Sequence, residues 1–309
     1  MYHRFSESPK KGYVSRDVFE SQVRHIARYY NAVSMTELVK GVKGEAILKP
    51  NSIAITVDDG YYDFYTVAYP ILKKYRVPAT VFVTTKFVDG GFWLWPDKIS
   101  YALDSLSEIP EEIQLGSQRV SAGELTPTYK QQVWHAIVGY LLAIPECDKQ
   151  QWISNFAAKQ NLNIPVEPID DYRAVTWGQL REMEENGIEV GGHTVTHPSL
   201  GRVGYEQLRA EVVECKRALD QQLDCRERHF CYPNGQLQDF TEVAKAVVSE
   251  AGFQSAVVAF HDSMRLADIY ELRRYSSSED QFQFMKSVAG LELLASLINN
   301  SNSRLSWSF

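Results

Sequence analysis

The chain has 309 residues, of which 44% are apolar and 23% are charged, and its formal net charge is −7. This composition is ordinary for a globular protein with one large core or two domains. The negative charge argues against a nucleic-acid-binding protein, because such proteins usually carry a basic excess. The best apolar stretch, residues 133–144, is too short for a membrane span of about 20 residues. The N-terminus shows no apolar signal region, so we expect a cytoplasmic protein.

The four cysteines do not form a recognisable metal or disulfide pattern. No two of them make a Cys-x-x-Cys pair, which excludes a zinc finger, and a chain of this length needs no disulfide staples. We therefore expect reduced thiols at Cys147, Cys215, Cys225 and Cys231.

Helices and buried strands are predicted to alternate over the first 90 residues. Ser15 can begin a helix, and residues 34–37 match a capping box that begins a second one. The β-branched run 53–57 predicts a buried strand. A helix is predicted over 67–75, since Pro78 stops it, and a strand over 80–83. This alternation is typical of parallel α/β proteins.

The segment 92–175 interrupts the alternation. It contains several prolines together with Trp93 and Trp95, and helices are predicted at 129–142 and 149–160. No clean linker flanks this segment. We therefore expect an insertion or lid on the main fold and not a separate domain.

The alternation resumes after residue 175. A second capping box, residues 176–179, begins a helix that is predicted to end at Asn186-Gly187. A strand follows at 188–190 and leads into His193. The next helix is indicated by an apolar stripe at Leu208, Val212, Cys215 and Leu219.

Two further strands and a helix are predicted before the tail. Residues 229–232 and 255–258 form the strands, and a helix capped within 239–242 ends at Gly252. The Ser/Asn-rich tail from about residue 299 is predicted to be frayed. Repeated strand–helix units imply parallel strands with outer helices, in a barrel or an open doubly wound sheet, within one domain of residues 1–309.

Three polar motifs each follow a predicted strand. They are Asp58-Asp59-Gly60, His193-Thr-Val-Thr-His197 and Pro233-Asn234-Gly235. Alone, the first and third are turn signals. The two histidines could bind a metal from one side of a helical turn, or could equally be two ordinary polar surface residues. Because active sites of parallel α/β folds gather at the carboxyl ends of the strands, their joint placement favours a metal site.

The donor set is suited to hydrolysis. Two imidazoles and one carboxylate can hold a divalent ion and leave a position for water, whose pKa the ion lowers. One of the two adjacent aspartates can bind the ion while the other accepts the proton of the water as general base. The ion and a nearby backbone N–H can stabilise the oxyanion of an amide or ester.

At these motifs the chain resembles the polysaccharide deacetylases of the NodB-homology type, carbohydrate esterase family 4. The first family motif, Thr-Phe-Asp-Asp-Gly, is similar to residues 56–60, and the second, His-Ser/Thr-x-x-His, to residues 193–197. The third, an aromatic strand that ends in Pro-x-Gly, is similar to residues 230–235. The resemblance covers most of residues 1–275, with 92–175 as the insertion.

The resemblance implies a distorted (β/α) barrel with fewer than eight strands. It also implies that Asp59, His193 and His197 bind the metal, which is Zn²⁺ or alternatively Co²⁺, Mn²⁺ or Ni²⁺, and that Asp58 is the catalytic base. The expected activity is removal of N-acetyl groups from an amino-sugar polysaccharide or its glycan precursor.

The third motif implies a substrate-binding role for Tyr232, Pro233 and Asn234, with a backbone N–H near Asn234 in the oxyanion hole. The chain departs from the family pattern here. Cys231 stands where the family often has arginine, and Asn234 stands where it often has tyrosine.

Two catalytic assignments stay open at the level of sequence. Arg274 is the best match to an arginine that orients the base, but a solvated surface arginine is an equal alternative. The family supplies a histidine general acid near the C-terminus, and no histidine follows His261. The general acid for the leaving amine is therefore either His261 or another group. Alternatively, the amine takes the proton that Asp58 has accepted from the metal-bound water. His3 could reach the site, although a core histidine is the favoured interpretation.

Two other functions remain as alternatives: a catalytically weak sugar-binding protein of the same fold, and a deacylase of small non-sugar amides.

Aromatic residues near the motifs could stack on sugar rings or could instead pack in the core or lid. These residues are Tyr61, Tyr62, Trp93 and Trp95. For a cytoplasmic protein, a lipid-linked or nucleotide-linked precursor is the more accessible substrate.

Overall fold

The computed structural model describes residues 1–108, 110, 112–121, 126–260 and 268–290. The chain divides into two compact units. The first comprises Met1–Asp89 and Arg173–Phe309, and the second comprises Gly90–Tyr172. The second unit overlaps most of the segment for which an insertion is predicted. Its role as a lid stays a prediction.

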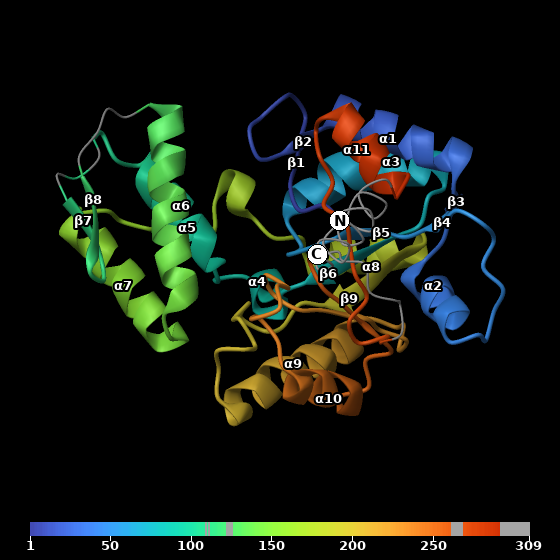
Figure 1. Ribbon diagram of the computed structural model, residues 1–309. Helices are drawn as coiled ribbons and strands as arrows, with labels where there is room; N and C mark the ends of the chain where they lie inside the picture. Colours follow the sequence, from blue (N-terminus) through green and yellow to red (C-terminus); the bar gives the residue numbers. More distant parts are fainter. Residues whose placement is uncertain (109, 111, 122–125, 261–267, 291–309) are drawn as a thin grey trace, which may run out of the picture. The chain divides into compact units, whose positions relative to one another are not determined.

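A five-stranded parallel sheet forms the centre of the first unit (Figure 1). Its strands, in spatial order, are β11 (Ala256–Val257), β10 (Phe230–Cys231), β9 (Ile188–Gly192), β6 (Ala79–Val83) and β5 (Ile55–Val57). Parallel bridges extend it at both edges, where Tyr2 pairs with Val57 and Leu272 pairs with Val257. The predicted distorted (β/α) barrel is confirmed.

Helices cover both sides of this sheet. In Figure 1, α1 and α3 lie on one side, and α9 and α10 lie on the other. The helices of this unit are α1 (Arg16–Tyr29), α2 (Met35–Val42), α3 (Tyr69–Tyr75), α4 (Thr85–Asp89), α8 (Trp177–Glu185), α9 (Tyr205–Gln222), α10 (Glu242–Glu250) and α11 (Gln281–Val288). The described part of this unit also contains two small parallel pairs: β1 (Phe5–Ser6) with β2 (Val14–Ser15), and β3 (Asn31–Ala32) with β4 (Ser52–Ile53).

Most predicted elements are present, with different bounds. The predicted strand 53–57 is divided between β4 and β5, and a π-helical turn, Phe64–Ala68, precedes α3. Both capping boxes are confirmed, at Ser34 and Thr176. The helix capped within 239–242 begins after Thr241. Asp239 is not its cap, because its carboxylate instead accepts a hydrogen bond from Ser199.

The second unit has its own apolar core. Its helices are α5 (Trp95–Asp104), α6 (Pro127–Ala143) and α7 (Glu146–Lys159), and its hairpin is β7 (Glu112–Leu115) with β8 (Gln118–Ser121). The two predicted helices are confirmed. The hairpin was not predicted, although Gly116, with a φ of 62°, supplies its turn and the side chains of β7 alternate between exposed and buried.

The central strands are buried on both faces, as parallel strands under helices usually are. All residues of β5 and β6 are buried. Close packing explains the paired glycines at the end of β9. A Cβ atom on Gly191 would lie 2.5 Å from the ring of Phe82, and one on Gly192 would lie 2.8 Å from the ring of Phe253.

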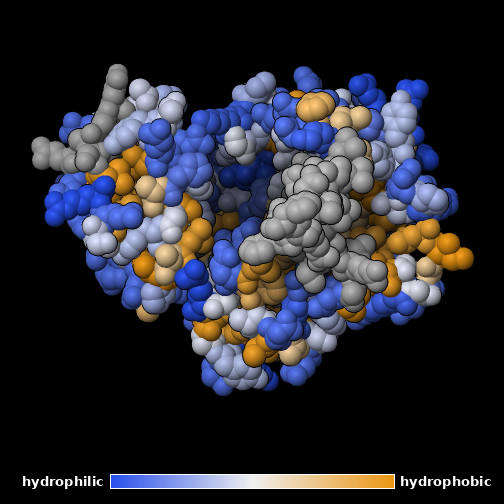
Figure 2. Space-filling model, viewed as in Figure 1, coloured by the Kyte–Doolittle hydropathy of each residue, from blue (hydrophilic) through white to orange (hydrophobic). Residues whose placement is uncertain are grey.

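Hydrophilic residues cover most of the face shown in Figure 2, with apolar residues between them. Within the described ranges, no helix combines the length and the apolar character needed to cross a membrane. All four cysteines are free thiols, as predicted.

Candidate metal and catalytic site

The polar motifs converge at the carboxyl ends of β5, β9 and β10. Parallel strands bring the residues that follow them to one edge of the sheet. A cavity of about 190 Å³ lies there. Its lining residues are His3, Asp58, Asp59, His193, His197, Tyr232, Asn234 and Ala259.

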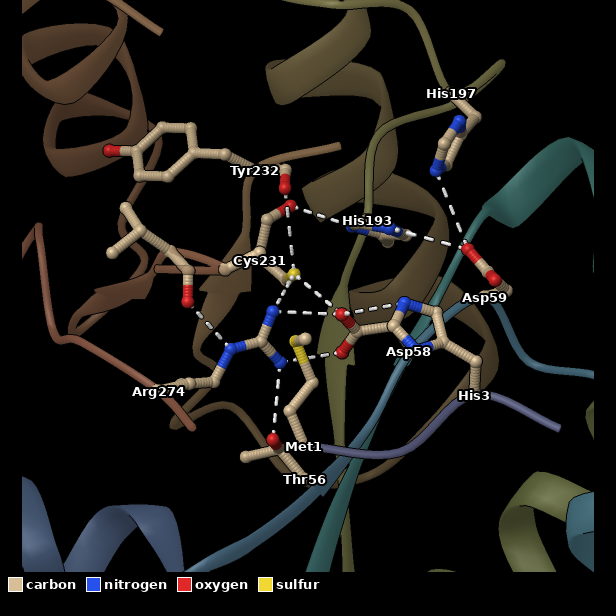
Figure 3. Close-up of polar contacts among 12 residues, drawn as sticks. Met1, His3, Thr56, Asp58, Asp59, His193, His197, Cys231, Tyr232 and Arg274 are labelled. Carbon is tan, nitrogen blue, oxygen red and sulfur yellow. Dashed lines mark hydrogen bonds and ion pairs between the residues drawn. The ribbon is translucent and has the colours of Figure 1, made fainter. Parts of the chain in front are cut away.

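Asp59 lies between the two histidines of the second motif (Figure 3). The Nε2 atoms of His193 and His197 are each 3.4 Å from Oδ1 of Asp59. One ligand atom from each of the three residues can be chosen so that all lie within 4.8 Å of one another. The three side chains expected to bind metal are therefore brought together, and all three are buried.

The histidine pair does not lie on a helical turn, which corrects the interpretation of its spacing. Residues 193–197 form an irregular loop after β9. Thr194 and His197 have φ values of 64° and 62°, in the left-handed region. The Thr194 hydroxyl accepts a hydrogen bond from the backbone N–H of His197 at 2.9 Å. The loop therefore turns back on itself, and both imidazoles can face Asp59.

Hydrogen bonding fixes the tautomer of His193 in its neutral form. Its Nδ1 lies 2.8 Å from the carbonyl oxygen of Cys231, which can only accept, so Nδ1 carries the hydrogen. Nε2 then presents a lone pair to an oxygen of Asp59. Two electron-rich atoms face each other favourably only when a proton or a cation lies between them.

The donor set fits a divalent ion. A histidine that donates its other ring N–H to a carbonyl oxygen is the usual arrangement for a metal ligand, and His193 has it. Nδ1 of His197 is buried without a hydrogen-bond partner among the described residues. Two imidazole nitrogens and one carboxylate oxygen match the ligands of catalytic zinc sites.

Arg274 binds the carboxylate of Asp58 with both of its terminal nitrogens. Nη1 donates to Oδ1 at 2.7 Å and Nη2 donates to Oδ2 at 2.8 Å. Both side chains are buried, so the alternative of a solvated surface arginine is wrong. Burial by itself would raise the pKa of Asp58, but the charge and hydrogen bonds of Arg274 outweigh it and hold this pKa below its usual value.

Three further contacts hold the guanidinium in place. Its Nε donates to the carbonyl oxygen of Val258 at 2.9 Å, and its Nη1 also donates to the Thr56 hydroxyl at 3.1 Å. Nη2 lies 3.1 Å from Sγ of Cys231. Cys231, which stands where the family often has an arginine, therefore contacts Arg274. Arg274 comes from another part of the chain and binds Asp58.

His3 approaches Asp58 from the side opposite Arg274 (Figure 3). Its Nε2 is 3.7 Å from Oδ2 of Asp58, and its side chain is 47% exposed. The interpretation of His3 as a core histidine is therefore wrong. Backbone hydrogen bonds join the adjacent Tyr2 to Thr56 and to Asp58, at 2.9 and 3.0 Å.

The N-terminal segment is also held by side chains. Arg4 donates to Asp63 at 2.8 Å, and its guanidinium lies 3.8 Å from the ring centre of Tyr61. The chain segment that carries His3 is thus held beside the cavity, and the His3 side chain lines that cavity. The sequence feature that pointed to this placement was the histidine itself, in the extended segment at the start of the chain. His261, the other candidate proton donor, lies outside the described residues.

Two of the three residues assigned to substrate binding in the third motif, Tyr232 and Asn234, line the cavity. Tyr232 lines the cavity, but its ring is buried and its hydroxyl donates to the carbonyl oxygen of Tyr270. Asn234 also lines it, with a φ of 59°. Pro233 is not among the lining residues, and its carbonyl oxygen accepts from Gly235. A side chain at Gly235 would lie 2.7 Å from the backbone of Ala259, which explains the glycine.

The aromatic residues near the motifs serve mostly in packing. Tyr61 is 5% exposed, and Trp93 and Trp95 of the second unit are each 3% exposed. These rings are too buried to stack on a sugar. Tyr62 is partly exposed.

The sequence profile of the family described as polysaccharide deacetylase matches residues 46–138 and 149–256. The chain belongs to the polysaccharide deacetylase family. It is an enzyme of that family, a hydrolase of carbon–nitrogen bonds other than peptide bonds. No curated protein sequence matches the chain.

Several solved structures share the fold. The deacetylase PplD of Streptococcus pyogenes, in complex with acetate, is 18% identical with a TM-score of 0.61. A de-N-acetylase from Aggregatibacter actinomycetemcomitans is 16% identical, and IcaB from Ammonifex degensii is 18% identical, both with TM-scores of 0.59. Each alignment covers 93% of this chain and, in the same order, 96%, 97% and 94% of the other.

Proposed function

We propose that this enzyme uses a divalent metal ion to remove N-acetyl groups from an amino-sugar polysaccharide or its glycan precursor. The observation that carries the proposal is the convergence of Asp59, His193 and His197 beside a second, ion-paired carboxylate in one cavity. Zn²⁺ suits these ligands, and Co²⁺, Mn²⁺ or Ni²⁺ could replace it. A bound ion would supply a Lewis acid that polarises the acetyl oxygen and lowers the pKa of a water molecule.

Asp58 is the general base in this proposal. Its low pKa keeps the carboxylate ionised at neutral pH, and Arg274 fixes the direction of both oxygens. An ionised and oriented carboxylate can accept the proton of the attacking water. Asp58 does not need to bind the ion, because Asp59 and the two histidines supply three ligands.

His3 is the proton donor for the leaving amine in this proposal. An amine leaves readily only when its nitrogen receives a proton. His3 lies next to the base, lines the cavity and is half exposed, so a substrate at the mouth can reach it. The backbone N–H of Asn234, at the cavity edge, is proposed to stabilise the oxyanion.

The structural relatives support the substrate class. The S. pyogenes deacetylase was solved with acetate, the product expected of deacetylation. Another relative is described as a de-N-acetylase, which favours an amide over an ester. The predicted cytoplasmic location would make a lipid-linked or nucleotide-linked precursor the accessible glycan.

Acetate release tests the function. Protein stripped with a chelator is incubated with N-acetylglucosamine oligomers, with and without added Zn²⁺. We expect acetate release that depends on the metal. Tight oligomer binding without release would favour the sugar-binding alternative, and turnover of small amides such as ureides but not of sugars would favour the deacylase.

A further inference from the structure

The loop that carries His193 and His197 has a backbone conformation that requires support. Thr194 and His197 both lie in the left-handed region, and β-branched residues are rare there. Such residues persist only where the surroundings hold them. The conformation is therefore held by the hydrogen bond between Thr194 and His197 within the loop and by contacts from outside it.

Glu211 supplies three contacts to this loop. The backbone N–H groups of Thr85 and Lys86 supply two more, to the carbonyl oxygens of Thr194 and Val195, both at 3.1 Å. Glu211 lies on α9, is 6% exposed, and directs its carboxylate at the middle of the loop. Oε2 accepts from the backbone N–H groups of Val195 and Thr196, both at 2.8 Å. Oε1 accepts from the Thr196 hydroxyl. One buried carboxylate thus binds two consecutive amides and the side chain between the two histidines.

The position of Glu211 in its helix shows that this contact is built into the fold. Leu208, Val212 and Cys215 are buried residues of the same helix face. A carboxylate on such a face is costly unless hydrogen bonds compensate it. Consecutive backbone N–H groups form a concave site for an anion, so the loop and the carboxylate satisfy each other.

We propose that Glu211 is a positioning residue for the metal ligands: it holds the 193–197 loop so that both imidazoles face Asp59. The inference rests on the metal site proposed above. It assigns Glu211 no contact with the ion or the substrate. Its effect reaches the metal through Val195 and Thr196, which lie between the two ligands in sequence.

Metal affinity is the direct test. Zn²⁺ is titrated into chelator-stripped wild type and Glu211→Ala in competition with a chromophoric chelator. Loss of a residue that orients metal ligands typically weakens metal binding about 10–100-fold, and we expect a loss in this range. Glu211→Gln keeps an acceptor for the amides and a donor for the Thr196 hydroxyl, so it should lose less. Glu214→Ala, an exposed position on the same helix, should match wild type.

The visible absorption of bound Co²⁺ separates positioning from general destabilisation. A changed ligand arrangement alters the Co²⁺ bands of Glu211→Ala, whereas a purely structural loss leaves them as in wild type. If Glu211→Ala does not fold, Thr196→Val removes one of the three contacts and should weaken Zn²⁺ binding by a smaller factor.

The outcomes distinguish the two proposals. If wild type binds Zn²⁺ and Glu211→Ala binds it equally tightly with unchanged Co²⁺ bands, the positioning role is overturned and the metal site stands. If wild type binds no metal, the metal site itself is wrong and the role of Glu211 falls with it.

Discussion

Arg274 and Asp58 form a buried, two-bonded ion pair between residues 216 positions apart in sequence. The pair joins the segment after β11 to the end of β5. These two strands are the opposite edges of the sheet, so the ion pair links both edges across the site. Paired hydrogen bonds between guanidinium and carboxylate fix geometry as well as charge. One contact therefore contributes both to the fold and to the direction of the proposed base.

Replacing Arg274 with Met should destabilise the protein. It leaves the Asp58 carboxylate buried without its cation, and breaking a buried pair in this way costs about 3–5 kcal/mol. Urea unfolding of the metal-free protein measures the loss. The double variant with Asp58→Asn should recover part of it, because no buried charge remains. A loss below about 1 kcal/mol for Arg274→Met would show that the carboxylate finds another partner.

Asp58→Asn and His193→Ala should separate catalysis from metal binding. Asp58→Asn keeps the three proposed ligands, so it should bind Zn²⁺ with near wild-type affinity while kcat falls by about 10²–10⁴, the usual contribution of a general base. His193→Ala removes one ligand and should lose the metal. Metal content after dialysis and acetate release measure the two effects. Equal metal loss in both variants would contradict the division of roles.

The chain's local patterns predicted only part of this site. Asp59, His193 and His197 lie in short motifs directly after strands, so parallel pairing brings the two motifs to the same edge of the sheet. The position of His3 could not be predicted this way, because it depends on the bridge between Tyr2 and Val57, which no local pattern specifies. Arg274 likewise reaches Asp58 only through the order of the strands.

Other features did leave a signal in the sequence. Glu211 interrupts the apolar stripe of α9 between Leu208 and Cys215, and a carboxylate on a buried face indicates a buried partner. The hairpin of the second unit was missed because its strands carry charged and amide side chains. In both cases the pattern was present but more polar than those used to predict the other elements.

His3→Gln should impair amide hydrolysis more than ester hydrolysis. A sugar amine is a poor leaving group and needs a proton, whereas an activated phenol leaves without one. We expect kcat for N-acetylglucosamine oligomers to fall by about 10²–10⁴, with a much smaller loss for an aryl acetate. Metal content should not change.

A parallel loss on both substrates would contradict the proton-donor role of His3 and indicate a role in positioning Asp58. His135→Gln, at an exposed position of the second unit, is a matched control that should leave both activities unchanged.

His229 lies at the end of the sheet opposite the catalytic cavity, and it should make the free energy of unfolding depend on pH. It lies directly before β10, is 2% exposed, and hydrogen-bonds Ser255 at 2.8 Å and Thr36 at 3.1 Å. Burial lowers its pKa from the ordinary 6.5 to about 4, although the acidic groups Glu189 and Glu227 oppose the shift and Lys43 favours it.

The sign of the effect follows from linkage. The unfolded chain binds a proton at His229 more readily than the folded chain does. The stabilisation that comes from a neutral His229 is therefore complete above about pH 6.5 and is lost as pH falls towards about 4. The total loss in the free energy of unfolding is on the order of 3 kcal/mol. Urea unfolding at pH 7 and pH 4.5, with chelator present, should show a smaller pH-dependent loss for His229→Gln than for wild type. An identical loss in both proteins would mean that His229 is already charged in the fold, or that its charge is accommodated there without cost.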